Sequence, residues 1–327
     1  MVKGFWKKIK KPVFVLAPMA NVTDAAFRHI IATYGKPDVI WTEFVAVDGL
    51  CSPEGRKELL VDLKYSEIER PIVAQIFGSK PQNFYEAAQL VSELGFDGID
   101  INMGCPDKNV TMKQKAGAAL IQTPELAVEI IKETKRGAGK LPVSVKTRLG
   151  YNKNILDTWL KTLLETDVAA ITIHARTKKE MSDVPAHWEE IKKAVEIRDT
   201  LDSSKNKTLI IGNGDVKNLA EAEQKVTETG CDGVMIGRGI FGNPWLFNRH
   251  IDPSSITIQE KLRVMLEHTF LFDSVLGNHK SLMIMKKHYK AYVNGFEGAK
   301  ELRIKLMEAE SLAEIKKITN EFLLKMQ

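Results

Sequence analysis

The sequence predicts an α/β protein in which a closed (β/α)₈ barrel, the TIM barrel, precedes a small helical bundle. Eight short apolar segments alternate with helix patterns over roughly 240 residues, which matches this barrel in number and length. Strand patterns end before Pro253, and only helix patterns follow. Because 327 residues exceed the ~250 at which single cores stop growing, we expect two domains, a barrel over residues 1–252 and a helical domain over residues 253–327.

The predicted strands are short apolar runs, each followed by turn residues and a helix pattern. They cover residues 13–17, 39–42, 72–77, 98–101, 143–145, 170–173, 208–211 and 233–236. The spacing of apolar residues predicts a helix over 81–94. Thr23 is the expected N-cap of the first helix, and Thr123 and Pro124 supply an N-cap and a first-turn proline for a helix over 125–135.

Residues suited to binding or catalysis lie at or just beyond the carboxyl ends of these strands. They are Pro18, Glu43, Gln75, Asn102, Cys105, Lys146, His174, Asn213, Asp215 and Arg238. In a closed barrel these ends share the one face that carries active sites. An open doubly wound sheet would also accept the alternation, but it would not gather all eight ends around one pocket. The pattern therefore favours the barrel.

The C-terminal stretch has helix patterns throughout. Thr257 and Glu260 form a capping-box pattern at the start of a helix. Its expected buried face comprises Leu262, Met265, Leu266 and Phe270. Further helices are expected over 282–293, 299–306 and 312–324. A basic cluster in this stretch comprises Lys286, Lys287, His288 and Lys290, with Tyr289 and Tyr292 among them. The cluster suits contact with RNA phosphates, or the solvated face of an amphipathic helix docked on the barrel.

Composition limits the class of protein. The three cysteines, Cys51, Cys105 and Cys231, form no C-x-x-C pair, so we expect neither a disulfide framework nor a metal site. No apolar run approaches the ~18 residues of a membrane span, and the first residues lack a secretory signal, so we expect a cytoplasmic protein. The net charge of +5 is mild. Five lysines between residues 3 and 11 form either a solvated tail or a nucleic-acid contact.

Cys105 is the most conspicuous candidate for chemistry. The fourth apolar run stops at Asn102, Gly104 permits a tight turn, and Pro106 blocks regular hydrogen bonding. The thiol is therefore expected on a loop with its side chain presented, beside an amide that can both donate and accept hydrogen bonds. The alternative is a buried cysteine in a βα turn.

Two glycine-rich turns, 212–215 and 237–239, follow the last two strands. Barrels commonly hold a phosphate there on backbone N–H groups, and Arg238 could add a bidentate contact. Tight turns alone would also explain the glycines, but two adjacent turns with an arginine favour a phosphorylated ligand. Neither the G-x-G-x-x-G of a Rossmann unit nor a Walker lysine loop is present.

Lys146 admits three interpretations. It could form a Schiff base, pair with Glu43 as a structural cation, or lie against the electron-rich edge of a reduced cofactor. A Schiff base would leave Cys105 and Gln75 without a role. A flavin needs amide and cationic partners around its pyrimidine ring, so a flavin accounts for all of these residues.

Eight ordered segments resemble the motif set of the tRNA-dihydrouridine synthase family. They are LAPMANVTDAAFR, VAQIFG, GIDINMGCP, KAGAALI, VSVKTRLG, ITIHART, IIGNGDV and VMIGRGIFGNPWLF. The resemblance extends from Val13 to about His250, and the tail MKKHYKAYVNGFEGAKELRIKL is similar to that family's helical domain.

The resemblance implies an FMN-dependent oxidoreductase that reduces the C5=C6 bond of particular uridines in tRNA, with NADPH re-reducing the flavin. We expect a monomer. Cys105 matches the proton donor of the family, and Asn102 and Arg176 match positions that face the flipped base. The residues that match flavin contacts are Ala17, Pro18, Met19, Gln75, Lys146 and His174. Those that match the phosphate site are Asn213, Gly214, Asp215, Gly237 and Arg238.

The implied chemistry needs an acid beside the uracil. Hydride transfer from flavin N5 to C6 leaves enolate character that requires a proton at C5, and a thiol with a pKa near ~8.5 is protonated at neutral pH. Lys146 near flavin N1 and the C2 carbonyl would stabilise the anionic reduced ring. The base must also leave its stack, so loop cations are expected to hold the tRNA backbone, unless they are ordinary surface residues. The candidates are Lys108, Lys113, Lys115, Arg148, Lys178 and Lys179.

The chain departs from the family pattern at Asn21 and over residues 181–188, where the family usually runs through an aromatic residue and a glycine to a tryptophan. The second departure bears on loop shape and target preference, not on flavin binding. Two other functions fit part of the pattern. An FMN barrel acting on a free pyrimidine, similar to dihydroorotate dehydrogenase, would carry no basic helical tail. A non-catalytic RNA-binding barrel would not need Cys105, Lys146 and His174 together.

Overall fold

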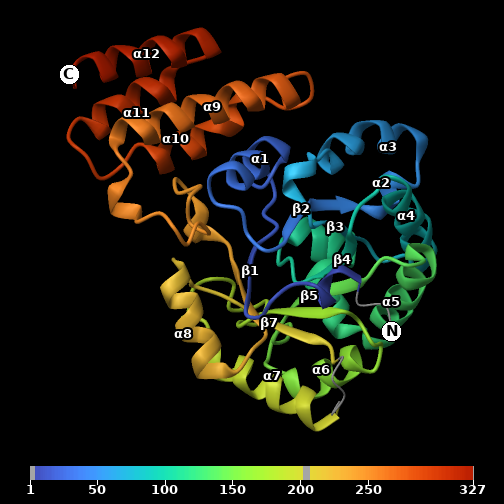
Figure 1. Ribbon diagram of the computed structural model, residues 1–327. Helices are drawn as coiled ribbons and strands as arrows, with labels where there is room; N and C mark the ends of the chain where they lie inside the picture. The colour runs from blue at the N-terminus through green and yellow to red at the C-terminus, as the bar shows by residue number, and fades with distance from the viewer. Residues whose placement is uncertain (1–3, 202–206, 327) are drawn as a thin grey trace.

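The structure, a computed structural model, describes residues 4–201 and 207–326 and contains the expected barrel (Figure 1). Eight parallel strands form one sheet in the order β1-β8-β7-β6-β5-β4-β3-β2. A parallel bridge between Val15 and Val39 joins the two ends of this order, and the Leu16 N–H donates to the Val39 carbonyl at 3.3 Å. The sheet is therefore closed at the entry to β2.

The strands agree with the expected runs and differ mainly in where they end. They are β1 (Val13–Leu16), β2 (Ile40–Ala46), β3 (Ile72–Phe77), β4 (Gly98–Met103), β5 (Val143–Arg148), β6 (Ala170–His174), β7 (Leu209–Asn213) and β8 (Gly233–Ile236). Strands β2, β4 and β5 continue past their predicted ends. Glu43, Asn102 and Lys146 therefore lie within strands, because the ladder accepts polar residues whose side chains enter the barrel.

Helices surround the strands on the outside, as the alternation predicts (Figure 1). They are α1 (Ala25–Tyr34), α2 (Val47–Leu50), α3 (Pro53–Leu59), α4 (Pro81–Glu93), α5 (Pro124–Ala138), α6 (Leu156–Leu164), α7 (Trp188–Leu201) and α8 (Leu219–Thr229). Their inward faces pack on the outer side of the sheet in one continuous apolar cluster. After β8 the chain forms short 3₁₀ turns at Arg238–Ile240 and Pro253–Ser255 before the next long helix.

Of the two predicted helix caps, the one at Thr23 is wrong, and the one at Thr123 is right in position but lacks a side-chain hydrogen bond. The N-cap of α1 is Asp24, whose carboxylate accepts from the Phe27 N–H, whereas the Thr23 hydroxyl accepts from the Met19 N–H at 2.9 Å. Thr123 precedes Pro124 as expected, but its side chain makes no capping hydrogen bond. The Thr23 hydroxyl is already hydrogen-bonded to the loop before α1, so the carboxylate of Asp24 caps the helix instead.

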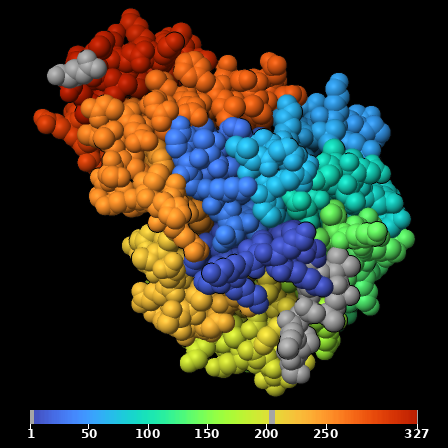
Figure 2. All heavy atoms as spheres, in the orientation of Figure 1, coloured from blue at the N-terminus to red at the C-terminus, as the bar shows by residue number. Residues whose placement is uncertain are grey.

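The barrel interior is apolar at the amino ends of the strands and polar toward the carboxyl ends. Trp6, on the 3₁₀ turn Gly4–Lys7, contacts Trp41 with ring centroids 6.0 Å apart and closes the amino end. Figure 2 shows the deep-blue N-terminal segment lying across this face of the barrel. Ligand access is therefore left to the opposite, carboxyl end.

The C-terminal helices form a separate bundle beside α1, here called the helical region (Figure 1). It comprises α9 (Ile258–Leu276), α10 (Lys286–Tyr292), α11 (Ala299–Glu308) and α12 (Leu312–Leu324). Thr257 caps α9 by accepting from the Glu260 N–H at 3.1 Å. Ala26 and Ile30 of α1 belong to its apolar cluster, so the bundle and the barrel share a packed interface. None of the described helices has the length and apolar character needed to cross a membrane.

In the helical region, two predictions about which residues are buried differ from the structure. The pattern places Phe270 in the buried face of α9, but it is 38% exposed, and Phe272 is buried instead. Of the two interpretations of the basic cluster, RNA contact is wrong for His288, Tyr289 and Tyr292, because all three are buried as in a docked helix. The reason is that α10 is short and turns these rings toward α9 and the barrel, where His288 lies 4.7 Å from the Phe27 ring.

Candidate functional site

A pocket of about 790 Å³ opens at the carboxyl ends of β1, β5, β6, β7 and β8. Its lining includes Ala17, Pro18, Met19, Lys146, His174, Asn213, Gly214, Asp215, Gly237 and Arg238. These are all of the predicted cofactor residues except Gln75. The structure therefore brings together residues that lie up to 221 positions apart in the sequence, and the carboxyl-end rule for barrels explains why.

Glycine turns form part of the pocket lining. A Cβ on Gly237 would lie 3.6 Å from the Ala17 Cβ and 3.7 Å from the Met19 sulfur, so the absence of a side chain leaves open space in front of both residues. A Cβ on Gly239 would approach the Lys217 carbonyl at 2.7 Å, which only glycine avoids. Arg238 is largely exposed beside them. Close backbone and a guanidinium are the groups that hold a phosphate.

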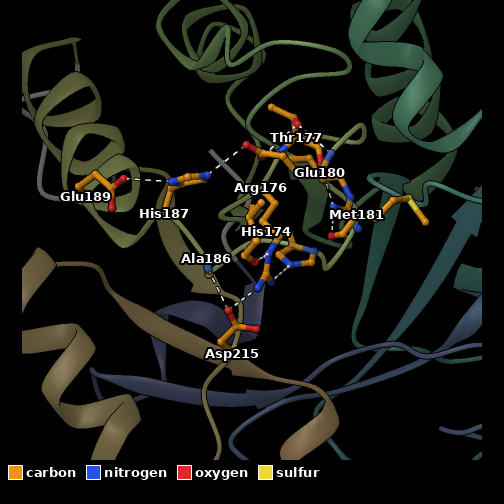
Figure 3. A network of polar contacts seen from close by, with 11 residues as sticks. His174, Arg176, Thr177, Glu180, Met181, Ala186, His187, Glu189 and Asp215 are labelled. Atoms are coloured by element: carbon orange, nitrogen blue, oxygen red, sulfur yellow. Dashed lines mark hydrogen bonds and ion pairs between the residues drawn. The ribbon is translucent and has the colours of Figure 1, made fainter.

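Asp215 links the two arginines of the site, and Figure 3 shows its contacts with Arg176 and Ala186. Its carboxylate accepts from Arg176, from Arg238 at 2.9 Å and from the Ala186 N–H at 2.9 Å. Burial acts to raise the pKa of Asp215, but the Ala186 hydrogen bond and the two guanidinium groups outweigh it, so this pKa is lowered. Asp215 therefore stays anionic and orients Arg238, and a phosphate would meet the arginine and the backbone rather than this carboxylate.

The pocket lining also includes Lys146 and His174, beside the glycine turn of residues 212–215. Burial lowers the pKa of Lys146 to about 8, and the nearby Arg148 adds to the effect. The amine lies 3.4 Å from the Asn213 Oδ1. Glu43 instead accepts from Lys280 at 2.8 Å, so the interpretation of Lys146 as the ionic partner of Glu43 is wrong.

His174 is held in one protonation state by its neighbours. Burial lowers its pKa far below the ordinary value, and the cations Arg148, Lys146 and Arg176 lower it further. The imidazole is therefore neutral. Its Nε2 lies 3.1 Å from the Arg176 Nη1, which can only donate, so the ring proton is assigned to Nδ1 (Figure 3). His174 thus offers an N–H donor at its other nitrogen.

A buried polar chain runs beneath the pocket. The Gln75 amide donates to Asp100 at 2.7 Å and accepts from the Asn102 amide at 3.1 Å, and Ser144 donates to Asp100 at 2.5 Å. Burial raises the pKa of Asp100 to about 6. Gln75 is completely buried and does not line the pocket. Sequence reasoning missed Asp100, although a lone carboxylate within an apolar strand was the available signal.

Asn102 shapes the loop that carries Cys105. Its side-chain oxygen accepts from the Gly104 N–H at 3.1 Å and the Cys105 N–H at 2.9 Å. Behind the thiol, Gly117 has φ +58°, and a Cβ there would lie 2.9 Å from the Cys105 carbonyl. The Ala118 N–H donates to that same carbonyl at 3.0 Å. The thiol loop is therefore fixed from both sides by backbone hydrogen bonds.

The Cys105 side chain is partly exposed and packs at the edge of an apolar cluster with Phe77 and Val110. Burial raises the pKa of this thiol, and the N–H of Asp107 and the cations Arg148 and Lys146 only partly oppose the rise. The sulfur is therefore protonated at neutral pH. A protonated, partly exposed thiol is a proton donor, whereas a nucleophilic cysteine needs the opposite shift.

Arg148 is buried and joins the loop after β4 to the loop after β6 through hydrogen bonds. Its guanidinium donates to the Gly104 carbonyl at 2.7 Å, the Thr177 carbonyl at 3.0 Å and the Met181 carbonyl at 3.1 Å, and the side chain is buried. The prediction that Arg148 contacts tRNA phosphates is therefore wrong. The residue instead ties the Cys105 loop to the loop after β6.

The loop of residues 181–188, where the chain departs from the family pattern, is well supported. Arg176 donates to the Val184 carbonyl at 2.7 Å, and Glu180 accepts from Thr177 and lies 3.2 Å from His187 (Figure 3). Trp188 ends the loop and donates its indole N–H to the Gly214 carbonyl at 3.0 Å. The tryptophan therefore packs beneath the glycine turn of the pocket.

The predicted RNA-contacting cations fall into two groups. Lys108, Lys113, Lys115 and Lys179 are exposed, and Lys178 is half-buried, with its amine 4.9 Å from the centroid of the Tyr151 ring. Lys286 and Lys287 are also half-buried, and their amines donate to the carbonyls of Met307 and Asn21. Lys290 is exposed. Among the described residues, no group of three or more His, Cys, Asp and Glu side chains is arranged to hold a metal ion.

Fold and site together define a (β/α)₈ protein with a phosphate-compatible pocket and a protonated, partly exposed thiol on the loop after β4, outside the pocket lining. Residues 15–327 match the family model described as Dihydrouridine synthase (Dus). A probable tRNA-dihydrouridine synthase of Staphylococcus aureus (strain MRSA252) is 43% identical over 324 residues, which are 98% of this chain and 96% of the relative. Probable tRNA-dihydrouridine synthase 2 of Bacillus subtilis (strain 168) is 41% identical over 324 residues, 98% of this chain and 97% of the relative. The chain belongs to the dihydrouridine synthase family.

Solved structures show the same architecture at low identity. Histamine dehydrogenase from Rhizobium sp. 4-9 matches with a TM-score of 0.53 and 13% identity, over 79% of this chain and 48% of that chain. Morphinone reductase in complex with tetrahydroNAD matches with a TM-score of 0.50 and 13% identity, over 74% of this chain and 89% of that chain. At this identity the likeness establishes the barrel fold alone.

Proposed function

We propose that this protein reduces particular uridines of tRNA to 5,6-dihydrouridine, with FMN as its cofactor and NADPH as the reductant. The observation that carries the proposal is one pocket at the carboxyl ends of the strands that both glycine turns line together with Lys146 and His174. In this proposal residues 1–252 bind FMN and carry the chemistry, and residues 253–327 contribute to tRNA binding. The protein acts as a cytoplasmic monomer.

The pocket lining offers groups for both the phosphate and the ring of FMN. Its volume of about 790 Å³ lies in the range of sites for cofactors and drug-sized ligands. The space left by Gly237, together with Arg238, suits a phosphate, and Lys146 and His174 suit the polar edge of a flavin ring. Lys146 would oppose negative charge on the ring, and His174 would donate from Nδ1 to a ring acceptor. Gln75 would support the floor through Asn102 and Asp100, one layer below.

Cys105 supplies the proton of the reaction. FMN, when bound, supplies the hydride for C6 of the uracil ring. The Cys105 S–H bond then breaks as a C–H bond forms at C5, and solvent reprotonates the thiolate. The raised pKa of this thiol supports the role, because the thiol is protonated at neutral pH before each turnover. Asn102 holds the loop in place through its two backbone hydrogen bonds, and Arg148 anchors the loop from the other side.

The uridine must be flipped into the barrel mouth, because a stacked base cannot reach a ring lying in the pocket. Disrupting the tRNA stack costs several kcal/mol, which contacts to the phosphates must offset. The exposed lysines Lys108, Lys113 and Lys115 follow the thiol loop directly, so they suit this role. Asn102 and Arg176 remain our candidates for facing the base, with Arg176 reaching it only if its contact with Asp215 opens.

Mass-spectrometric mapping of tRNA tests this function. The purified chain, FMN and NADPH are incubated with tRNA from cells lacking the protein, and the product is digested and mapped. The proposal predicts a mass gain of two hydrogen atoms at one defined set of uridines, and loss of the same modification in cells without the protein. A protein that binds FMN and oxidises or reduces a free pyrimidine, but leaves tRNA unchanged, would overturn the tRNA substrate.

A further inference from the structure

Part of the pocket lining comes from a loop that is hydrogen-bonded to the helical region. This loop, residues 18–24, is called the opening loop here, and its Pro18 and Met19 line the pocket. Met19 is bonded to the far side of the same loop, because its N–H donates to the Thr23 hydroxyl at 2.9 Å and its carbonyl accepts the Val22 and Thr23 N–H groups at 3.0 Å. The position of Met19 therefore depends on the course of the loop between them. The middle of the loop, at Asn21, is held by groups from outside.

Both backbone groups of Asn21 have distant partners. The residue has φ +54°, a conformation that asparagine tolerates better than most residues. Its N–H donates to the Glu43 carboxylate at the mouth of the barrel, and its carbonyl accepts from Lys287 on α10. The partner lysine lies 266 positions further along the chain. The tip of the opening loop is therefore clamped between β2 and the helical region.

Glu43 is itself held by the helical region. Lys280, between α9 and α10, places its amine 2.8 Å from the Glu43 Oε2 and 2.6 Å from the Asp62 Oδ1. The side chains of Lys280 and Glu43 are only 14% and 7% exposed. Burial acts to lower the pKa of Lys280, but the two carboxylates outweigh it and raise this pKa, so the bridge stays ionised. Removing the lysine would leave a buried carboxylate without its counter-ion.

We propose that Lys280 and Lys287 are positioning residues for the cofactor, which act from the helical region through Glu43 and Asn21 on the opening loop. The inference rests on the proposed function, because it concerns affinity for FMN. Neither lysine lines the pocket, so neither contacts a ligand bound there. The two lysines raise the fraction of molecules in which the opening loop has its present conformation. In that conformation Pro18 and Met19 occupy the positions from which they would contact FMN.

The expected effect is a weaker affinity with an intact fold. If the loop occupies its present position only about one-tenth of the time, the apparent dissociation constant for FMN rises ~10-fold, because affinity falls in proportion to the competent fraction. We expect ~10-fold for Lys280→Met, which unpairs a buried carboxylate, and ~3-fold for Lys287→Met, which removes one hydrogen bond to Asn21. The variant Lys280→Arg keeps the charge and should stay within ~2-fold of the parent.

The experiment measures release of FMN from the flavin-loaded full-length chain. FMN fluorescence is recorded on serial dilution to obtain the dissociation constant, and far-ultraviolet circular dichroism confirms folding at the same temperature. Lys286→Met is the matched control, because this neighbouring lysine donates to the Met307 carbonyl within the helical region. The double variant Lys280→Met with Glu43→Gln removes both charges and covers the case in which Lys280→Met alone fails to fold.

The outcomes separate this inference from the proposed function. Weaker FMN binding in Lys280→Met and Lys287→Met, with the parent affinity kept in Lys286→Met and Lys280→Arg, supports the positioning role. The inference is overturned, while the proposed function stands, if the parent FMN affinity is kept in folded Lys287→Met and in whichever of Lys280→Met and the Lys280→Met, Glu43→Gln double variant folds. An equal loss in Lys286→Met also overturns it, because the effect is then a general one of the helical region. A parent chain that binds no FMN overturns both.

Discussion

Replacing Lys146 by methionine should make the protein more stable and less active. The buried amine has its pKa lowered from 10.5 to about 8, which corresponds to about 3 kcal/mol of unfavourable free energy for its charged form at neutral pH. The side chain is partly open to the pocket, and Asp100 loses a nearby cation in the variant, so we expect a net gain of about 2 kcal/mol at pH 7. Methionine keeps the apolar stem in place.

The gain in Lys146→Met should depend on pH with a defined sign. Below pH 8 the folded and unfolded states of the parent both hold the proton, so the folded state bears the full cost of the buried charge. Between about 8 and 10.5 the unfolded chain keeps its proton while the folded chain has lost it, so the parent gains stability as pH rises. The advantage of the variant should therefore shrink to about 1 kcal/mol near pH 9.5.

Urea unfolding of flavin-free parent and variant at pH 7 and pH 9.5, followed by tryptophan fluorescence, measures this difference. Under the proposed function, stopped-flow reduction of the bound flavin by NADPH should be slower in the variant, since the cation that we propose beside the flavin ring is lost. A variant that is less stable than the parent at pH 7, or a gain that does not change with pH, would refute the argument that burial lowers the pKa of Lys146.

Two further predictions concern stability and tRNA binding. Arg28→Met should lower the free energy of unfolding by about 3–5 kcal/mol, because Arg28 and Glu69 form a fully buried ion pair at 2.7 Å, and adding Glu69→Gln should restore part of the loss in urea unfolding. An undiminished stability of Arg28→Met would show that the pair is dispensable. The double variant Lys113→Ala with Lys115→Ala should weaken tRNA binding and leave the flavin spectrum unchanged. The slope of the logarithm of the tRNA binding constant against the logarithm of salt concentration should fall in magnitude by about 1 for each phosphate that a lysine no longer neutralises. Filter binding at several salt concentrations checks this, and an unchanged slope would assign these lysines to the ordinary surface.

The pocket could be predicted from the sequence because the barrel imposes one simple rule. Residues at the carboxyl ends of parallel strands meet at one face, so motifs as distant as Pro18 and Arg238 can be placed together from the strand pattern alone. Gln75 shows where this rule loses precision. How deep a strand residue lies depends on the stagger between neighbouring strands, which a single strand pattern does not encode. Gln75 is consequently fully buried and lies outside the pocket lining.

Contacts between distant segments escape sequence reasoning altogether. Arg148 resembles a surface cation in sequence because nothing in its local pattern indicates that three carbonyls from two other loops surround it. Lys280 carries no signal either, since its partners Glu43 and Asp62 lie more than 200 positions earlier in the chain. The buried rings of α10 are misassigned for a related reason: a helix of seven residues is too short for its pattern to distinguish the exposed face from the packed one.

The role of Cys105 is tested most directly by a single turnover of Cys105→Ala. The flavin-loaded variant is reduced with NADPH, mixed with unmodified tRNA, and assayed by mass spectrometry for dihydrouridine. We predict that the variant stays yellow and is reduced at the parent rate, while dihydrouridine formation falls by at least ~100-fold, the usual contribution of a general acid. Product formation at the parent rate, or loss of the bound flavin, would contradict the assignment of this thiol as the proton donor.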